Sequence, residues 1–151
     1  MRIYSLIIFF LFIARLQGQT ITNTVNTDPY FECLKLYLSS LIEMGIYKTG
    51  DTAYVSQRDY ISDYTGVYHD VFIKMVNNEL LFELTKKKRA IRVLVINPLE
   101  FKDGYATINV VNFGTSRKRK HYTLINNGFN RIKVGFDCKV GKYEYEVVDS
   151  Y

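Results

Sequence analysis

The chain has 151 residues, with 20 Lys and Arg against 15 Asp and Glu, and a formal net charge of +5. This length suits one domain with a real core and is too short for two. Acidic residues offset most of the basic ones, which argues against a dedicated nucleic-acid-binding protein. No repeat, linker or low-complexity segment divides the chain.

The N-terminus has the pattern of an export signal. Arg2 precedes an apolar run from Ile7 to Ala14, and Gly18 stands at a position suited to signal peptidase. An N-terminal membrane anchor is the alternative, but the run is shorter than the ~20 apolar residues that a span needs. The sequence therefore predicts a signal peptide at 1–18, a single mature domain at 19–151 without a transmembrane span, and a secreted or periplasmic location.

A long amphipathic helix is predicted after the polar segment 19–27. Asp28 can cap its free N–H groups, Pro29 fits its first turn, and Gly45 ends it. One broad face is apolar and needs a sheet to pack against. That face carries Tyr30, Phe31, Leu34, Tyr37, Leu38, Leu41 and Ile42.

The middle of the chain predicts two strands and a second helix. Residues 51–57 are a candidate strand, residues 58–66 read as a loop, and residues 67–76 alternate well enough for another strand. Asn77 or Asn78 could cap a short helix that runs to Lys88.

The stretch 90–151 predicts a meander of antiparallel strands. Residues 91–97 are nearly all apolar, as in a strand buried on both faces. Asp103-Gly104 predicts a tight hairpin before a strand at 105–113, where a change of parity indicates a bulge near Val110. A strand at 118–125 then leads to Asn126-Asn127-Gly128, which predicts a turn.

The last two predicted strands alternate between apolar and polar residues. In the first, one set of side chains should face the core and the other set should face water. The core set is Ile132, Val134, Phe136 and Cys138. Gly141 predicts the final turn, and Tyr143, Tyr145 and Val147 share one face of the strand 142–148.

The predicted fold class is α+β, with a long N-terminal helix packed on a curved antiparallel β-sheet and a second short helix. This order resembles the cystatin-like and NTF2-like group. The segments Ile96-Asn97-Pro98-Leu99, Phe113-Gly114 and Phe136-Asp137-Cys138 are also similar to small, largely uncharacterised secreted proteins of Gram-negative bacteria with that architecture. The resemblance implies the fold but no catalytic residue, and the QxVxG-type loop of inhibitory cystatins is absent from the sequence.

No motif with a specific chemical signature occurs. His69 and His121 are the only histidines, and the chain has no HExxH, CxxC, GxSxG or glycine-rich phosphate loop, so no metal or cofactor is predicted. His69-Asp70 with Asp59 and Asp63 is the best carboxylate–imidazole cluster, although a solvated loop is the commoner explanation. Glu144 and Glu146 share a strand face and could act as an acid/base pair. The alternative is that both simply belong to the solvent-exposed face of the last strand.

Two basic runs could bind anions. They are Lys86-Lys87-Lys88-Arg89 and the run Arg117, Lys118, Arg119, Lys120 and His121. An acidic protein, lipid headgroups, a glycan or nucleic acid would fit such a surface, but an exported protein rarely meets nucleic acid. The ordinary alternative is a charged helix end, together with a charged hairpin that deters edge pairing.

The two cysteines are predicted to lie close together. Cys33 sits at the margin of the helix's apolar face, and Cys138 shares the parity of core residues. An oxidising compartment would permit a disulfide between them, while two buried, reduced cysteines are equally compatible with the pattern.

These features predict an exported, non-enzymatic binding protein whose partner is another protein or an anionic envelope component. One alternative is a binder of a small apolar or anionic ligand in a pocket between helix and sheet. Another is an exported hydrolase with an unrecognised site.

Overall fold

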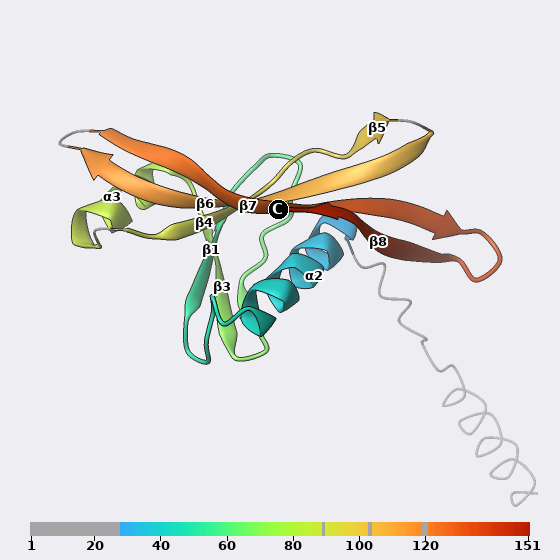
Figure 1. The fold of residues 1–151 in the computed structure, drawn as a ribbon, viewed down its shortest axis with the longest axis horizontal. Helices are drawn as coiled ribbons and strands as arrows, with labels where there is room; N and C mark the ends of the chain where they lie inside the picture. Colours follow the sequence, from blue (N-terminus) through green and yellow to red (C-terminus); the bar gives the residue numbers. More distant parts are fainter. Residues whose placement is uncertain (1–27, 89, 103, 119–120) are drawn as a thin grey trace, which may run out of the picture.

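The computed structural model describes residues 28–88, 90–102, 104–118 and 121–151, without the side chains of Lys102 and Lys118. The predicted signal peptide, residues 1–18, lies outside the described residues. Within the described part, helices α2 (Pro29–Glu43) and α3 (Asn78–Lys87) accompany one sheet of eight strands (Figure 1). The strands are β1 (Thr52–Ser56), β2 (Gly66–Tyr68), β3 (Val71–Val76), β4 (Arg92–Ile96), β5 (Glu100–Lys102), β6 (Tyr105–Lys118), β7 (His121–Asp137) and β8 (Lys142–Ser150).

The predicted α+β class is confirmed, with the N-terminal helix packed on a strongly curled sheet. The strand order is β2-β3-β1-β4-β6-β7-β8, and β5 pairs with β6. The sheet is mostly antiparallel, as expected, but β1 pairs in parallel with both β3 and β4. A parallel pair needs a long crossover connection, and α3 lies in the one that joins β3 to β4.

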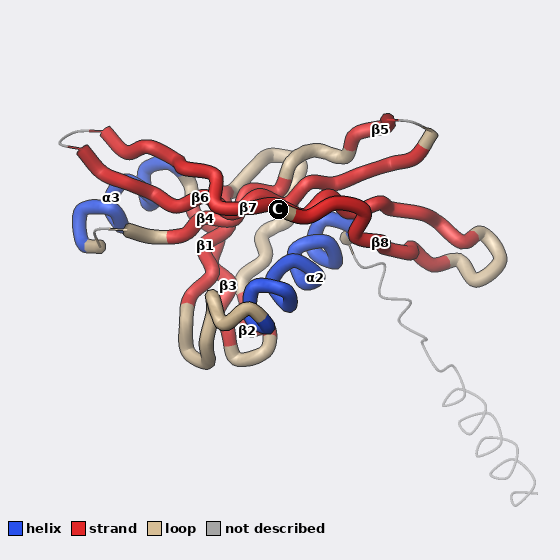
Figure 2. The backbone as a smooth tube through the Cα atoms, in the orientation of Figure 1, coloured by secondary structure: helices blue, strands red, loops and turns tan. Residues whose placement is uncertain are grey.

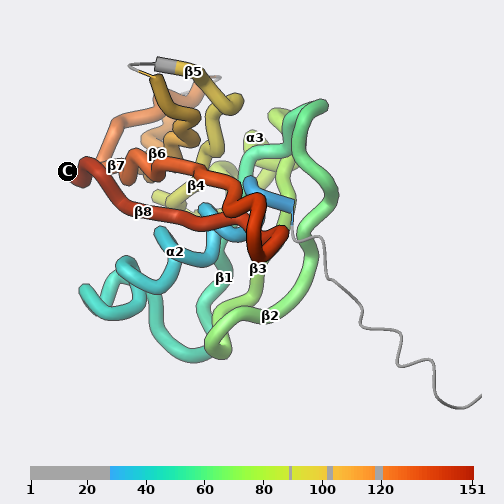
Figure 3. Tube along the Cα trace, turned by 90° about the vertical axis from the view of Figure 1, so that its right-hand side faces the viewer, coloured from blue at the N-terminus to red at the C-terminus, as the bar shows by residue number. Residues whose placement is uncertain are grey.

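Helix α2 covers one face of the sheet (Figure 3). Asp28 caps it by accepting a hydrogen bond from the Tyr30 backbone N–H at 2.9 Å, and Pro29 occupies its first turn, as predicted. The buried side chains of α2 pack on those of the sheet in the main core. On α2 they are Cys33, Leu34, Tyr37, Leu38 and Leu41, and opposite them lie Val55, Leu94, Ile96, Ile108, Val110 and Ile132.

Helix α3 covers part of the opposite face. Asn77 caps it by accepting from the Leu80 N–H at 2.8 Å. Its Leu81 packs with Val93 and Val95 of β4, while Leu94 and Ile96 face the α2 side. The prediction of a strand buried on both faces is therefore confirmed for β4.

The segment predicted as one strand at 67–76 is instead a hairpin. Strands β2 and β3 pair antiparallel, with Tyr68 opposite Val71, so His69 and Asp70 form the turn between them. Their φ values are +46° and +61°, the left-handed backbone that a type I′ hairpin turn requires at both central positions. Apolar residues flank the turn closely on both sides and no glycine marks it, which is why the sequence pattern hid it.

Substitutions at Asp70 should separate backbone strain from side-chain chemistry. We expect Asp70→Val to lower the free energy of unfolding by about 1–2 kcal/mol, because a β-branched residue is disfavoured at positive φ. Asp70→Gly should keep or slightly raise the stability, since glycine adopts this backbone freely. Urea denaturation of both variants measures the order, and a loss on Asp70→Gly as large as that on Asp70→Val would contradict a backbone origin.

Asn126-Asn127-Gly128 does not form the predicted turn but lies inside β7, which runs unbroken past it. The strand register explains why a glycine stands at position 128. Val111 pairs with Phe129 and Phe113 pairs with Asn126, so Asn127 and Gly128 together oppose one residue of β6. A bulge that changes the parity of the strand near Val110 was predicted; the irregularity lies close by, between Val111 and Phe113, but its extra residue is on β7 and β6 keeps its parity. Figure 2 shows both long strands changing direction near the middle of the sheet.

The core does not extend to the tip of the β7–β8 hairpin. Ile132 and Val134 are buried as predicted, but Phe136 is 55% exposed. Cys138 is exposed in the turn that follows β7, because that strand ends at Asp137. The alternating parity was correctly predicted, but the hairpin projects beyond the cover of α2 (Figure 1), so its outer residues meet no core.

Candidate macromolecule-binding surface

The two basic runs meet at one end of the sheet. The Lys86 Nζ lies 4.8 Å from the centroid of the Phe82 ring, and the Arg117 Cζ lies 5.4 Å from the same centroid. Helix α3 and the β6–β7 hairpin therefore each place a cation near the same aromatic ring. Both distances fall within the range of cation–π attraction.

A hydrogen bond and a further cation–π contact involve residues of α3 and its C-terminus that are close to Phe82 along the chain. The Tyr122 hydroxyl of β7 hydrogen-bonds the Asn78 Oδ1 at the start of α3, at 3.3 Å. Just after the C-terminus of α3, the Lys88 Nζ lies 5.9 Å from the centroid of the Tyr54 ring. We name as the cationic end the exposed side chains Lys86, Lys87, Lys88, Arg117 and His121.

Local sequence explains why each run is where it is. Lys86 and Lys87 occupy the last turn of α3, where positive charge suits the helix dipole. Of the predicted anion-binding residues of the hairpin, Arg117 and His121 are described, and Lys118 pairs with His121 through the backbone. The side chain of Lys118, and all of Arg119, Lys120 and Arg89, lie outside the described residues.

Acidic neighbours reduce the positive charge of the cationic end but do not cancel it. Glu83 pairs with Lys86, and Glu79 is exposed in the first turn of the same helix. Exposed ion pairs of this kind contribute little free energy, so Lys86 stays available to a stronger anionic partner. Sequence reasoning treated the two runs separately, because no local pattern shows that Phe82 lies between them.

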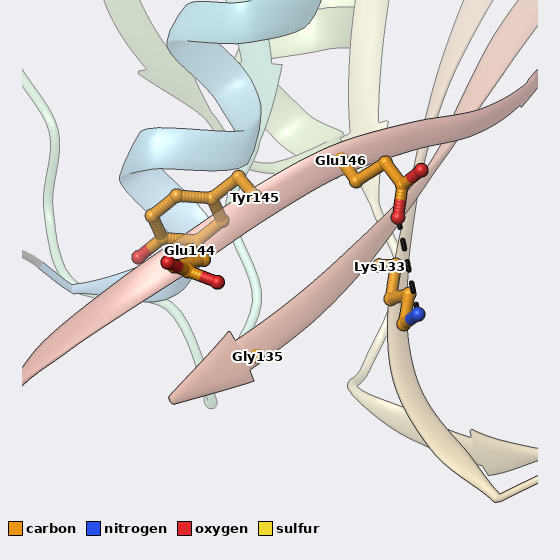
Figure 4. A pocket seen from close by; sticks show the side chains of 5 residues that line it. All are labelled: Lys133, Gly135, Glu144, Tyr145 and Glu146. Atoms are coloured by element: carbon orange, nitrogen blue, oxygen red, sulfur yellow. Dashed lines mark ion pairs between the residues drawn. The ribbon is translucent and has the colours of Figure 1, made fainter. Parts of the chain in front are cut away.

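The pair Glu144 and Glu146 lies at a hollow of about 490 Å³ on the β7–β8 hairpin, lined by Lys133, Gly135, Glu144, Tyr145 and Glu146 (Figure 4). Lys133 and Glu146 are cross-strand partners, with Nζ and Oε2 3.8 Å apart. Gly135 faces Glu144 across the same strands. Figure 4 shows Glu146 turned toward Lys133, with Glu144 lying apart from them.

Residues of the predicted carboxylate–imidazole cluster take part in local turn and loop contacts. His69 and Asp70 form the β2–β3 turn, and the His69 ring packs edge-on against Tyr68, with centroids 4.4 Å apart. Asp63 accepts a hydrogen bond from the Thr65 hydroxyl at 3.1 Å. Over the described ranges, no three His, Cys, Asp or Glu side chains gather closely enough to hold a metal ion.

Burial keeps the Cys33 thiol and several tyrosine hydroxyls in their protonated forms. Burial, reinforced by the charges of Glu32 and Asp28, raises the pKa of the Cys33 thiol to about 12. Burial also raises the pKa of Tyr47 to about 12, and it raises the pKa values of Tyr64 and Tyr145 further. A thiol that stays protonated at neutral pH is a poor nucleophile.

The structure does not join Cys33 to Cys138. Cys33 is fully buried on α2, Cys138 is exposed in the β7–β8 turn, and both are free cysteines. The predicted inward orientation of Cys138 is wrong, because β7 ends one residue before it.

In the described part of the chain, no helix is long and apolar enough to cross a membrane. Comparison of the chain with protein-family models, with curated proteins and with solved structures gave no match.

Proposed function

We propose that this protein is an exported, non-enzymatic binding protein that recognises an anionic macromolecule through its cationic end. The observation that carries the proposal is the convergence of two basic runs, distant in sequence, on the ring of Phe82. A helix end and a hairpin tip can each use basic residues for local reasons, but neither reason requires them to be adjacent. Gathering like charges costs free energy, and an anionic partner would offset that cost.

The partner belongs to one of two classes, an acidic protein or an anionic component of the cell envelope. Aromatic side chains interleaved with the cations suit both, because they supply apolar contact beside the charges. Export remains part of this proposal and rests on the N-terminal pattern. Membership of the cystatin-like and NTF2-like group is also proposed, and the helix packed on a strongly curled sheet is consistent with it.

Neutralising the cationic end should abolish most of the binding. We expect Lys86→Gln, Lys87→Gln and Arg117→Gln together to weaken binding to vesicles of phosphatidylcholine and phosphatidylglycerol by roughly tenfold or more, since each cation near an anionic surface contributes about 1 kcal/mol. Vesicle co-sedimentation at increasing salt concentrations measures this, and polyglutamate replaces the vesicles to test an acidic protein partner. Binding should also fall as salt is added.

A matched control carries the same loss of charge elsewhere. Lys48, Lys139 and Lys142 are exposed and lie outside the cationic end, so replacing all three with glutamine should preserve most of the binding. Equal losses in the two triple variants would show that only net charge matters. Absence of binding to both anionic probes by the unaltered protein would refute the proposal.

The small-ligand alternative is supported by one observation. A hollow of about 250 Å³ adjoins the cationic end and is lined by Lys88, Arg92, Tyr47 and Tyr54, among others. Two cations beside aromatic rings would suit a small organic anion.

A further inference from the structure

We propose that strand β8 is a docking edge that accepts an extended basic segment of a partner protein as an added strand. In the described sheet, β8 is the last strand in the order, and its described pairing is with β7 alone. Its outer side therefore presents backbone N–H and C=O groups that another strand can pair with. This surface is separate from the cationic end and does not depend on it.

The length of β8 distinguishes it from the other edges. Strands β2 and β5 have three residues each, and edges this short give an incoming strand few hydrogen bonds. Strand β8 has nine residues, and all of them except Tyr145 are exposed. Residues 121–126 of β7 pair with β6 alone and form another edge, but they are fewer and end at the bulge. Strand β8 is thus the edge on which an added strand would form the most backbone hydrogen bonds.

One face of the hairpin offers apolar contact to an added strand. Phe136 and Tyr143 are cross-strand partners whose ring centroids lie 5.1 Å apart, and they are 55% and 40% exposed. Val147, on the same face of β8, is 45% exposed. A strand laid beside β8 would extend this apolar face with every second residue.

The other face selects the charge of the added strand. Glu144 and Glu146 both lie there, and both are exposed. An incoming strand that alternates apolar and basic residues would place its apolar side chains beside Tyr143 and Val147 and its basic ones beside the two glutamates. The hollow at Gly135 leaves room next to Glu144 for a long basic side chain.

The same charges disfavour a second copy of this chain in the registers centred on the glutamates. Two β8 strands paired antiparallel about a two-fold axis at residue 144 or 146 would place a glutamate opposite its own copy. Pairing about residue 145 would place Glu144 opposite Glu146 in both directions. Like charges directly opposite each other destabilise a strand pair, so the proposed occupant is a different chain with basic residues. Pairing of two copies about residue 143 would place Lys142 opposite Glu144, and the dimer outcome of the test below covers that register.

Two short peptides test the edge directly. One alternates lysine and valine, and the other alternates glutamate and valine. Because the glutamate peptide would also bind the cationic end, both peptides are tested in every comparison on the variant with Lys86→Gln, Lys87→Gln and Arg117→Gln. That variant should bind the lysine peptide roughly tenfold or more tightly than the glutamate peptide, since opposite charges across a strand pair attract. Hydrogen exchange should show new protection of β8 amides in the complex, which charge attraction without strand addition would not produce.

Reversing the two glutamates should reverse the preference. Glu144→Lys with Glu146→Lys should favour the glutamate peptide, whereas Glu43→Lys with Asp59→Lys, an equal charge change at exposed positions elsewhere, should keep the preference for lysine. Circular dichroism verifies that both variants fold. If the first variant is unfolded, the single substitution Glu144→Gln replaces it and should reduce the preference.

Three outcomes would overturn the proposal. The first is equal affinity for both peptides, and the second is binding without protection of β8. The third is protection of β8 that appears without peptide and grows with protein concentration in step with dimer formation, which would assign the edge to a second copy.

Discussion

Replacing Gly128 with alanine should destabilise the protein by about 2–3 kcal/mol, through backbone strain and the loss of strand pairing. Gly128 has a φ of +142°, a conformation that side chains with a Cβ rarely adopt. A Cβ added there would lie 2.4 Å from the carbonyl oxygen of Tyr151. That oxygen accepts from the Phe129 N–H at 2.8 Å, and the Tyr151 N–H donates to the Phe129 oxygen at 3.0 Å, so the end of the chain must shift.

Gly135 in the same strand provides the control. A Cβ at that position would meet its nearest atoms, on Glu144, at 4.0 Å, which is ordinary contact. Gly135→Ala should therefore change the free energy of unfolding by less than about 1 kcal/mol. Guanidinium denaturation followed by circular dichroism compares the two variants, and similar stabilities would show that the bulge tolerates a side chain at Gly128.

The second large effect is expected in the main core. Leu38 is fully buried between α2 and the sheet, and Leu38→Ala should cost about 2–5 kcal/mol, because it removes apolar contact and leaves a cavity. Leu36, two residues earlier on the same helix, is 37% exposed, so Leu36→Ala should cost less than about 1 kcal/mol.

The comparison works because both substitutions have the same effect on intrinsic helix propensity. The difference in the free energy of unfolding between the two variants, measured by thermal or denaturant unfolding, then reflects the difference in burial of the two leucine side chains. If Leu36→Ala costs as much as Leu38→Ala, the packing of α2 on the sheet is not as described.

Local signals were sufficient for the elements whose partners did not need to be known. The ends of α2 followed from Asp28, Pro29 and Gly45, and its buried face followed from apolar spacing. The double burial of β4 followed from its continuous apolar run. Each of these features depends on a few consecutive residues.

Features that depend on distant partners were missed. Asn126-Asn127-Gly128 has the composition of a turn, but pairing with β6 carries the strand through it. Strand β1 runs parallel to both partners because the connections from β1 to β3 and, through α3, from β3 to β4 both cross over, and residue alternation is the same for either strand direction. Conversely, the turn at His69-Asp70 lacks the glycine that usually reveals one.

For the candidate surfaces, too, the local residues could be predicted from the sequence but their spatial arrangement could not. Both basic runs were evident in the sequence, but their meeting at Phe82 required the fold. The alternation of β8 was evident too, whereas its position at the edge follows only from the strand order. The projection of the β7–β8 tip beyond α2 likewise left Phe136 and Cys138 outside the core.

The central position of β1 has a consequence for how the chain reaches its native state. Both of its partners, β3 and β4, come later in the chain, whereas β4 to β8 pair with near neighbours through short connections. Closing long loops costs more chain entropy, so the antiparallel half should form first on refolding. During synthesis β1 and β3 both emerge before β4, so Val55 can pair with Met75 early but lacks its other neighbour, Leu94, until β4 has followed. We therefore expect the slowest step of folding to be the insertion of an early strand between two later ones.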